Sequence, residues 1–309
     1  MIEIFCKSGD QIKKIHDYQK GCWVNITAPA VGEIEDICSK LRIPSNHISD
    51  PLDVDERARI DVEDDYMLII IRVPYYDPNE EVSYRTLPLG IIYSSDYVIT
   101  VASRKLELIQ DFFQGKVKNF DCSNRERFIL LILFRAAVMY LNFLKEINGR
   151  SALIEKRLHM AINNKELLNL LLLEKSLVYF TTSLKADEIM ISRLSTTKRF
   201  KSSEDDAELF ADVIIEYRQA LEMSNIYSNI LTGMMNAFAS VISNNLNAVM
   251  RTLTSITILL MIPNMVAGFY GMNVKLPFQE SPYAFLITLT ISFILAIIAV
   301  LFLLRRRGR

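Results

Sequence analysis

The spacing of apolar residues changes character once along this chain, near residue 122. Before that point, short apolar runs rich in β-branched side chains alternate with polar turns, which is typical of strands and short helices. Helical spacing appears over 31–41 and 104–113. The runs that predict strands are 2–6, 22–26, 66–76, 87–93 and 97–101, with a hairpin turn at 94–96. We therefore assign residues 1–122 to a cytosolic domain of mixed α and β structure.

After residue 122 the pattern becomes helical. No proline occurs between Pro88 and Pro263, and strong helix formers dominate this stretch. Ser123 and Glu126 have the spacing of a capping box in front of an apolar run, which predicts that a helix starts there. This first helical region is expected to reach about residue 201, with a bend near 148–149 or 163–164.

A second long helix is expected to start near residue 203. Nothing in the sequence stops it before Pro263, which implies on the order of 60 residues and a length of about 90 Å. A helix this long cannot bury itself and needs partner helices, from its own chain or from other copies. Residues 123–250 are therefore assigned to a helical stalk in the cytosol.

Three apolar runs are long enough to raise the question of a membrane. The run 128–144 has Arg135 at its centre, which favours a buried helix of a soluble unit over a membrane span. The runs 252–274 and 281–304 contain no charged residue, and each is long enough to cross a bilayer. We predict spans at about 252–272 and 283–304, within a transmembrane domain of residues 251–309.

The two predicted spans form a hairpin, because only residues 275–280 separate them. Arg251 and the arginine cluster within 305–309 flank the same side, which the positive-inside rule places in the cytoplasm. The N-terminus lacks the pattern of a signal peptide, so the first domain is expected to stay in the cytosol. We therefore expect a multi-pass protein of the inner membrane or plasma membrane, with both termini in the cytoplasm.

One face of the first predicted span, the polar stripe, carries residues that lipid would not select. They recur at spacings of three and four, which places them on one side of a helix. The simpler interpretation is a packing face, where small residues allow close approach and amides bond to neighbouring helices. The alternative is a pore lined by a ring of identical subunits, since two spans cannot enclose a channel alone. The stripe consists of Asn247, Met250, Leu253, Thr257, Met261, Asn264, Gly268 and Gly271.

The end of the first span indicates what such a pore would carry. Gly268 and Gly271 allow close backbone approach, and Asn273 adds an amide where the stripe ends. No carboxylate occurs in this segment. Amide and carbonyl oxygens accept hydrogen bonds from the waters of a hydrated cation, and magnesium gives up its waters reluctantly. A neutral ring of this kind fits hydrated magnesium.

Composition argues against several other functions. The 35 basic and 36 acidic side chains give a formal net charge of -1, so we expect no nucleic-acid partner. The 4 cysteines and 3 histidines are scattered without metal-ligand spacing. No phosphate-binding loop and no pattern of nucleophile, histidine and acid stands out, so we expect neither ATP coupling nor enzymatic activity.

The segment "YGMN" at 270–273, at the end of the first of two C-terminal spans, resembles the signature of the CorA family of divalent cation transporters. The stalk and the N-terminal domain match the family as well, so the resemblance covers essentially the full chain. It implies a funnel-shaped homopentamer that transports Mg2+ and is closed by Mg2+ in the cytosol. It assigns an outer selectivity site for the hydrated ion to Gly271, Met272 and Asn273. It assigns pore constrictions to Asn247, Met250, Leu253, Met261 and Asn264.

The resemblance also implies a regulatory magnesium site between neighbouring cytosolic domains. The matching positions are Asp50 and Asp212, which residue chemistry alone would describe as ordinary solvated carboxylates. A divalent cation would offset the repulsion between carboxylates of two subunits, and its loss would loosen the interface. Ser49 stands where many relatives carry a second acid. Lys275 makes the outer loop less acidic than is common in the family.

Three functions compete at this point. The first is a gated magnesium channel driven by the membrane potential. The second is a zinc transporter or a cobalt and nickel importer of the same family, with Zn2+, Co2+ or Ni2+ as the ion. The third is a membrane-anchored coiled-coil sensor, against which the polar stripe argues, because an anchor needs no Asn264 or Asn273.

Overall fold

The computed structural model describes residues 1–8, 11–118, 120–160, 163–197, 200, 203–274, 276–278 and 281–307. The chain divides into two compact units, Met1–Met235 and Asn236–Arg309. The boundary lies inside a single helix, so each unit is described by itself. The first unit joins the α and β segment to most of the segment that the sequence assigns to the stalk.

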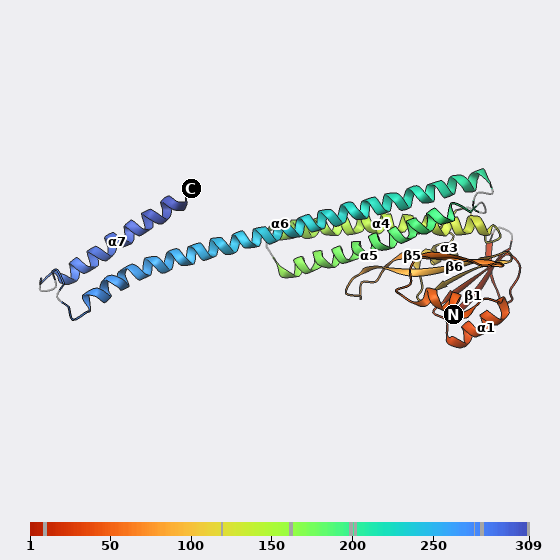
Figure 1. Ribbon diagram of the computed structural model, residues 1–309, viewed down its shortest axis with the longest axis horizontal. Coiled ribbons are helices and arrows are strands. Elements are labelled where there is room, and N and C mark those ends of the chain that lie inside the picture. The colour runs from red at the N-terminus through yellow and green to blue at the C-terminus, as the bar shows by residue number, and fades with distance from the viewer. Residues whose placement is uncertain are drawn as a thin grey trace. The chain divides into compact units, whose positions relative to one another are not determined.

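A single sheet organises the first unit (Figure 1). Its strands are β1 Ile2–Ser8, β2 Gln11–Ile15, β3 Cys22–Thr27, β4 Arg59–Val62, β5 Tyr66–Tyr76, β6 Tyr84–Ser94 and β7 Tyr97–Ala102. Among the described residues their order is β2-β1-β3-β7-β6-β5-β4. Of the pairs between described strands, only β3 and β7 are parallel. These two neighbours are far apart in sequence, because β4, β5 and β6 lie between them along the chain. The five apolar runs lie within strands as predicted, whereas the short polar strands β2 and β4 were not predicted.

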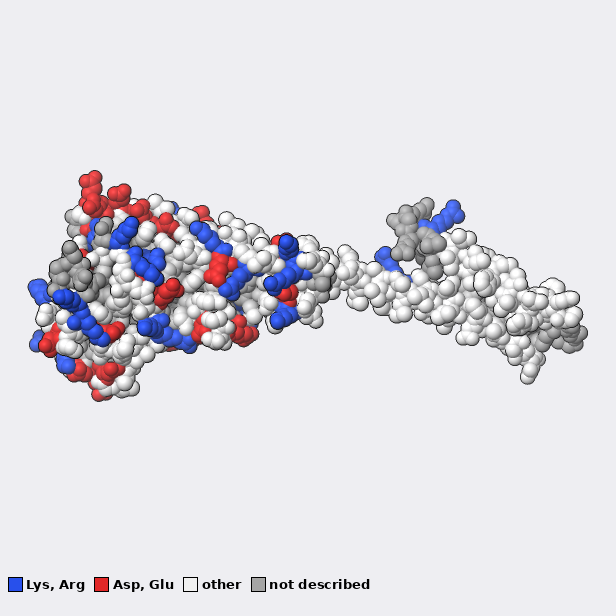
Figure 2. All heavy atoms as spheres, turned by 180° about the vertical axis from the view of Figure 1, so that it is seen from behind, with Lys and Arg blue, Asp and Glu red and all other residues white. Residues whose placement is uncertain are grey.

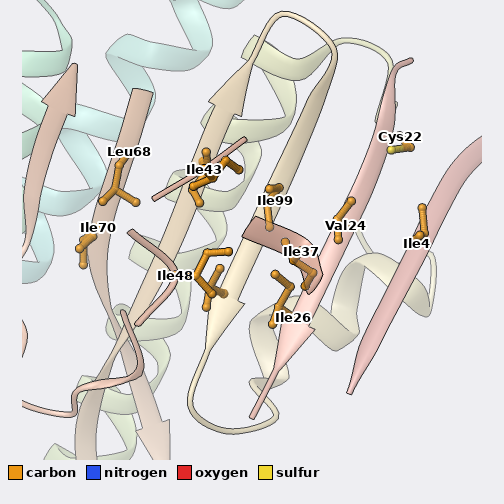
Figure 3. Close-up of a cluster of buried hydrophobic side chains, with 12 residues drawn as sticks. Ile4, Cys22, Val24, Ile26, Ile37, Ile43, Ile48, Leu68, Ile70 and Ile99 are labelled. Carbon is orange, nitrogen blue, oxygen red and sulfur yellow. The ribbon is translucent and has the colours of Figure 1, made fainter. Parts of the chain in front are cut away.

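One face of the sheet packs under two helices near the N-terminus, α1 Val31–Leu41 and α2 Ser45–Ser49. Ile37 of α1 and Ile48 of α2 lie over Val24, Ile26 and Ile99 of the central strands (Figure 3). All five side chains are fully buried. The alternation of strand residues therefore directs every second side chain of β3 and β7 into this core.

The opposite face of the sheet is covered by α3 Glu107–Phe113 and α4 Arg125–Met160. Trp23 directly precedes Val24 in β3, so its side chain points to this opposite face. It stacks on Phe113 with 4.8 Å between ring centroids, and its centroid lies 4.9 Å from that of Phe128 of α4. Its indole N–H donates to the Thr100 hydroxyl at 2.8 Å, so the polar atom of this buried ring is satisfied. The sheet thus lies between two helical layers.

The long helices begin and end at identifiable caps. The first helical region breaks between α4 and α5 Asn164–Leu194, where the Asn163 side chain accepts the Lys165 N–H at 2.9 Å. Of the two predicted bends, the one at 163–164 is therefore a true break, whereas Gly149 lies inside α4.

The predicted capping box at Ser123 and Glu126 is wrong. Helix α4 begins at Arg125, and the Asn124 side chain accepts the Arg127 N–H at 3.1 Å, so Asn124 is the cap. The Glu126 carboxylate accepts a hydrogen bond from the Tyr93 hydroxyl instead of reaching back to the backbone. A tertiary contact to the sheet has displaced the local one.

Helix α6 extends from Glu204 to Tyr270, a length of 67 residues. It continues past Pro263 and includes the first predicted span almost to its end. Proline has no N–H to offer the carbonyl of residue 259, so one intrahelical bond is missing within an otherwise continuous helix.

The second unit is a hairpin made by the C-terminal part of α6 and by α7 Ala284–Arg307 (Figure 1). Four described helices, α4, α5, α6 and α7, are long and apolar enough to cross a membrane by length and composition. The apolar window of α4 is 61% buried inside the protein, whereas those of α6 and α7 are each 6% buried. Figure 2 shows charged side chains spread over the first unit and a largely uncharged surface along the hairpin.

Candidate functional site

The hairpin gives α6 two faces with different surroundings. Between 252 and 270, the positions that are not fully exposed are Ser255, Leu259, Ile262, Val266 and Tyr270. At about 100° per residue, these positions lie within about 80° of one another around the helix. Val266 is the most deeply buried of them, with 6% of its surface exposed. This face is the one that α6 uses for packing inside its own chain.

Helix α7 presents a matching face of mostly small residues. Its less exposed positions follow a spacing close to four residues, and Ser292 is the most buried of them at 8%. The Thr288 and Ser292 hydroxyls donate to the carbonyls of Ala284 and Thr288 at 2.8 and 2.9 Å, so both are satisfied within α7. Small side chains with satisfied hydroxyls let two membrane helices approach closely. The positions are Ala284, Ile287, Thr288, Ile291, Ser292, Ala296 and Ala299.

The polar stripe lies on the other side of α6. Six of its members, from Met250 to Gly268, also fall within about 80°, and the centre of this arc is about 180° from the packing face. All of them are exposed within the chain; Leu253, for example, is 57% exposed and Met261 65%. Asn247 is exposed as well and lies at the edge of the arc. Packing on α7 therefore does not explain the amides and thioethers of this face.

The "GMN" segment forms a turn directly after α6. The Gly271 N–H donates to the Ala267 carbonyl at 2.9 Å, and the Met272 N–H donates to the Phe269 carbonyl at 3.2 Å. A Cβ atom on Gly271 would lie 3.3 Å from the Ala267 carbonyl oxygen, which favours glycine in this tight turn.

The turn presents its side chains outward. Met272 is 51% exposed and Asn273 is also exposed, while the Tyr270 hydroxyl donates to the Pro277 carbonyl at 3.2 Å and ties the loop to the helix end. The segment thus offers carbonyl and amide oxygens at the end of the polar stripe. Lys275 and Glu280, which the sequence analysis placed in the outer loop, lie outside the described residues.

In the first unit, the Asp50 carboxylate already has a charged partner. It lies at the start of the short 3-10 helix η1, Asp50–Leu52, and its Oδ2 accepts a hydrogen bond from the Arg59 guanidinium at 2.7 Å. Arg59 also bonds Asp61 at 2.7 Å and contacts the Glu56 carboxylate. Partial burial lowers the pKa of Arg59, but hydrogen bonds to Asp61 and Asp50 outweigh it and raise that pKa. One arginine therefore neutralises part of a three-carboxylate cluster.

Asp212 has different surroundings. It lies exposed on α6, five residues before the buried Tyr217. Within the described part of the chain, no three histidine, cysteine, aspartate or glutamate side chains gather as metal ligands. A cation held by Asp50 or Asp212 would therefore have to keep several waters or take further ligands from another copy, as Mg2+ commonly does.

Sequence reasoning missed the residues that organise this region. Arg59 sits inside the acidic segment 50–65, and only the fold brings the carboxylates of Asp50, Glu56 and Asp61 around it. The signal available in the sequence was a pair of arginines, Arg57 and Arg59, at the start of an alternating run, which is too common to single out. Asp187, a buried aspartate in α5, was also missed, because nothing in its sequence surroundings singles it out from other aspartates.

The chain is similar to known proteins over nearly its whole length. The family model described as "CorA-like Mg2+ transporter protein" matches residues 18–306. The cobalt/magnesium transport protein CorA of Methanocaldococcus jannaschii is 26% identical over 296 residues, covering 93% of this chain and 90% of that protein. The protein of the same name from Thermotoga maritima is 20% identical over 307 residues, covering 96% and 86%.

The fold is also that of a solved structure, the complete structure of the CorA magnesium transporter from Methanocaldococcus jannaschii. The TM-score is 0.83 at 24% identity, with 98% of this chain and 96% of that chain covered. The match includes the α and β segment, the long helices and the C-terminal hairpin. With the family model spanning 18–306, the chain belongs to the CorA-like Mg2+ transporter family.

Proposed function

We propose that this protein conducts hydrated Mg2+ across the membrane through a pore lined by the polar stripe of α6. Family membership makes it a membrane transporter of divalent cations. The observation that carries the finer proposal is the exposure of the whole stripe on the side of α6 away from α7. Side chains such as Asn264 and Thr257 are disfavoured against lipid, whereas they suit a water-filled path.

A pore of this kind requires several copies of the chain. One hairpin contributes two helices, and the apolar windows of both are only 6% buried within the chain. A closed ring gives each stripe the same inward position, and we propose a homopentamer in which the cytosolic units form a funnel. The lipid bilayer covers the remaining apolar surface.

The selectivity site in this proposal is formed by Gly271, Met272 and Asn273. Their amide and carbonyl oxygens accept hydrogen bonds from the first water shell of the ion, so the ion does not have to shed its waters to be recognised. Along the pore, Asn247, Met250, Leu253, Met261 and Asn264 form the constrictions, and Thr257 and Gly268 complete the lining.

The proposed topology places both termini in the cytoplasm, with spans at about 252–272 and 283–304 and domain boundaries near 122 and 250. The charge-free stretches of both helices and the flanking arginines support it. The side chain of Arg305 is exposed, as expected of a residue at the membrane surface.

The regulatory part of the proposal is that cytosolic Mg2+ binds between neighbouring first units at Asp50 and Asp212 and favours the closed state. Arg59 modifies this expectation, because its guanidinium already bonds Asp50. The ion would compete with a resident cation, which suits a weak sensor of cellular Mg2+ rather than a tight site.

Transport of Co2+, Ni2+ or Zn2+ is the second candidate. Two relatives are named cobalt/magnesium transport proteins. Comparing fluxes of Mg2+, Co2+, Ni2+ and Zn2+ into proteoliposomes, with and without an imposed voltage, separates the candidates. Flux of Zn2+ well above that of Mg2+ under equal voltage would contradict the magnesium assignment.

The pore face can be tested separately from the ion. Met261→Cys places a thiol on the stripe, and Ile258→Cys places one about 60° outside its arc on the same helix. We expect a membrane-impermeant thiol reagent to block flux through the Met261→Cys variant and to leave Ile258→Cys like the treated parent. Equal insensitivity of both variants would show that the stripe does not line a water path.

A further inference from the structure

The first unit contains an aspartate that is completely buried and forms no ion pair with the described residues. Asp187 lies in α5 and is 0% exposed. Its Oδ1 accepts the backbone N–H of Arg72 at 2.9 Å. Its Oδ2 is buried and has no hydrogen-bond partner in the described part of the chain. A carboxylate in this position would keep its negative charge at a high desolvation cost.

The Arg72 side chain does not supply the missing charge pair. Its terminal nitrogens donate to the Val54 and Glu56 carbonyls at 3.0 and 2.5 Å and to the Thr86 carbonyl at 3.0 Å, and not to the Asp187 carboxylate. Its Nε donates to the hydroxyls of Thr86 and Ser183 at 3.1 Å. The donors of this arginine are thus used on the loop after η1, on β6 and on Ser183 of α5, one turn before Asp187.

A second orphan oxygen lies across the helix interface. Tyr217 belongs to α6, is 1% exposed, and its hydroxyl has no partner in the described part of the chain. Burial raises its pKa first, and the neighbouring charges of Asp187 and Tyr140 raise it further. The Tyr140 hydroxyl of α4 already donates to the Arg72 carbonyl at 2.9 Å. Asp187 and Tyr217 are therefore the two unsatisfied polar groups where α5, α6 and β5 meet.

Asp111 shows what a buried carboxylate looks like in this protein when it is ionised. It is 1% exposed, and its oxygens accept from Arg135 at 2.8 and 2.5 Å and from Lys116 at 3.0 Å. Burial raises its pKa, but Arg135 and Lys116 outweigh burial and lower it. For Asp187, burial is the largest cause and raises the pKa well above the usual value, against the Arg72 amide and charge. The two sites have opposite protonation preferences.

We propose that Asp187 is a proton-binding site that controls how firmly α6 packs on α5 and β5. The protonated acid is neutral, so the desolvation cost of a buried charge disappears. Loss of the proton leaves an uncompensated charge between Arg72 of β5, Tyr140 of α4 and Tyr217 of α6. Because α6 is continuous as far as Tyr270, the proton acts on the helix that carries the polar stripe.

The sign of the pH dependence follows from linkage. A carboxyl group whose pKa is raised on folding takes up a proton when the chain folds. Its contribution to stability is greatest at low pH and falls as pH rises from about 4, the ordinary value, up to the raised pKa of the folded state. Asp111 contributes with the opposite sign, since its stabilisation is present above the ordinary pKa and is lost as pH falls.

The experiment compares the full-length protein with Asp187→Asn and Asp111→Asn in detergent, by thermal unfolding from pH 5 to 9. Asparagine matches the shape of the protonated acid and cannot ionise. We compare the Tm of wild type with the Tm of Asp187→Asn at each pH. Relative to the variant, the wild-type Tm should fall by about 3 °C for each pH unit over which Asp187 titrates. Asp111→Asn should be less stable than wild type at pH 7. Parallel pH profiles for wild type and Asp187→Asn, or a loss at pH 7 equal to that of Asp111→Asn, would overturn the proposal.

A second measurement does not depend on the variants folding equally well. Infrared spectra of the wild type should contain the carbonyl band of a protonated carboxylic acid that persists above pH 6, where solvated aspartates are ionised. Asp187→Asn should remove this band, because asparagine has no carboxylic acid group. Absence of the band from the folded wild type at pH 6 would show that Asp187 is ionised. Both readouts are independent of transport, so they stand or fall separately from the pore proposal.

Discussion

The two ends of α6 are stabilised in opposite ways. In the first unit, its buried residues follow a seam with spacings of three and four that faces the other helices of the unit. In the second unit, the same helix buries two of its described residues, Phe238 and Val266, and exposes its amides. The seam consists of Phe210, Val213, Tyr217, Ala220, Ser224 and, seven residues further on, Leu231.

This difference shows how one helix serves two environments. The first part is held by contacts that its own chain provides, so its position is a property of the folded unit. The second part packs on α7, and most of its remaining surface is exposed within the chain. We expect lipid and other copies of the chain to cover that surface. Substitutions should therefore damage folding in the first part and transport in the second.

The largest expected effect is on transport. Asn273→Ala should reduce Mg2+ flux on the order of 100-fold in proteoliposomes, because each of five copies would lose an amide contact contributing about 0.5 kcal/mol or more. Assembly, followed by size-exclusion chromatography, should be unchanged. Asn245→Ala is a matched control, since it removes an amide from the same helix well outside the stripe. Similar flux losses in both variants would contradict the assignment of the selectivity site.

Gly90→Ala should have the largest effect on folding. A Cβ atom at Gly90 of β6 would lie 2.3 Å from Cγ and 2.8 Å from Cβ of Pro51, the residue after Asp50. Overpacking of this kind costs about 1–3 kcal/mol, and relief requires η1 to move together with the candidate sensor residue. Chemical denaturation measures the loss.

Gly149→Ala is the control for that experiment. Gly149 is an exposed position inside α4 with nothing within 4 Å of a new Cβ atom, so alanine should stabilise the helix by about 0.5–1 kcal/mol. A Gly90→Ala protein as stable as the parent would mean that β6 and η1 are not packed as described.

Asp111→Asn should destabilise the first unit by about 2 kcal/mol at pH 7, because Arg135 and Lys116 lose a charged partner inside the protein. The pKa of Asp111 is lowered, so the difference from wild type should shrink as pH falls below about 4. Denaturant titrations at pH 7 and pH 3.5 measure it. A constant difference at both pH values would show that the ion pairs are not its cause.

The smallest expected effect is on regulation. Asp212→Lys should protect the first unit from proteolysis in the absence of Mg2+, because the lysine ammonium replaces the charge of the bound ion. Glu208→Lys, one turn earlier and also exposed, is the matched charge change. Digestion of both variants at the parental rate in chelator would remove Asp212 from the proposed site.

The sequence predicted those parts of the fold in which local pattern and final environment agree. The apolar strands, α1 and the charge-free hairpin were all visible, because hydrophobic spacing reflects burial or lipid directly. The strands β2 and β4 were not, since Gln11–Ile15 and Arg59–Val62 are too polar and short to stand out. The capping box failed because Tyr93, distant in sequence, binds Glu126.

The candidate site divides along the same line. The stripe follows from spacing, and the structure adds that it lies opposite the α7 contact. The surroundings of Asp50 could not be predicted, because Arg59 reaches it only when the segment between η1 and β4 folds back toward η1. Asp187 is a comparable case, since its missing partner is a property of three elements distant in sequence.

The hydroxyl groups along the membrane part of α6 have one further consequence. Thr252, Thr254, Ser255 and Thr257 each donate their proton to the carbonyl four residues earlier, at 2.8 to 3.0 Å. Their oxygens keep lone pairs but have no hydrogen left to offer. The water shell of a cation points its hydrogens outward and finds acceptors at Thr257, whereas that of chloride points oxygens outward and meets no donor there. At the level of Thr257, the proposed pore thus favours the water shell of a cation without a fixed charge in the membrane.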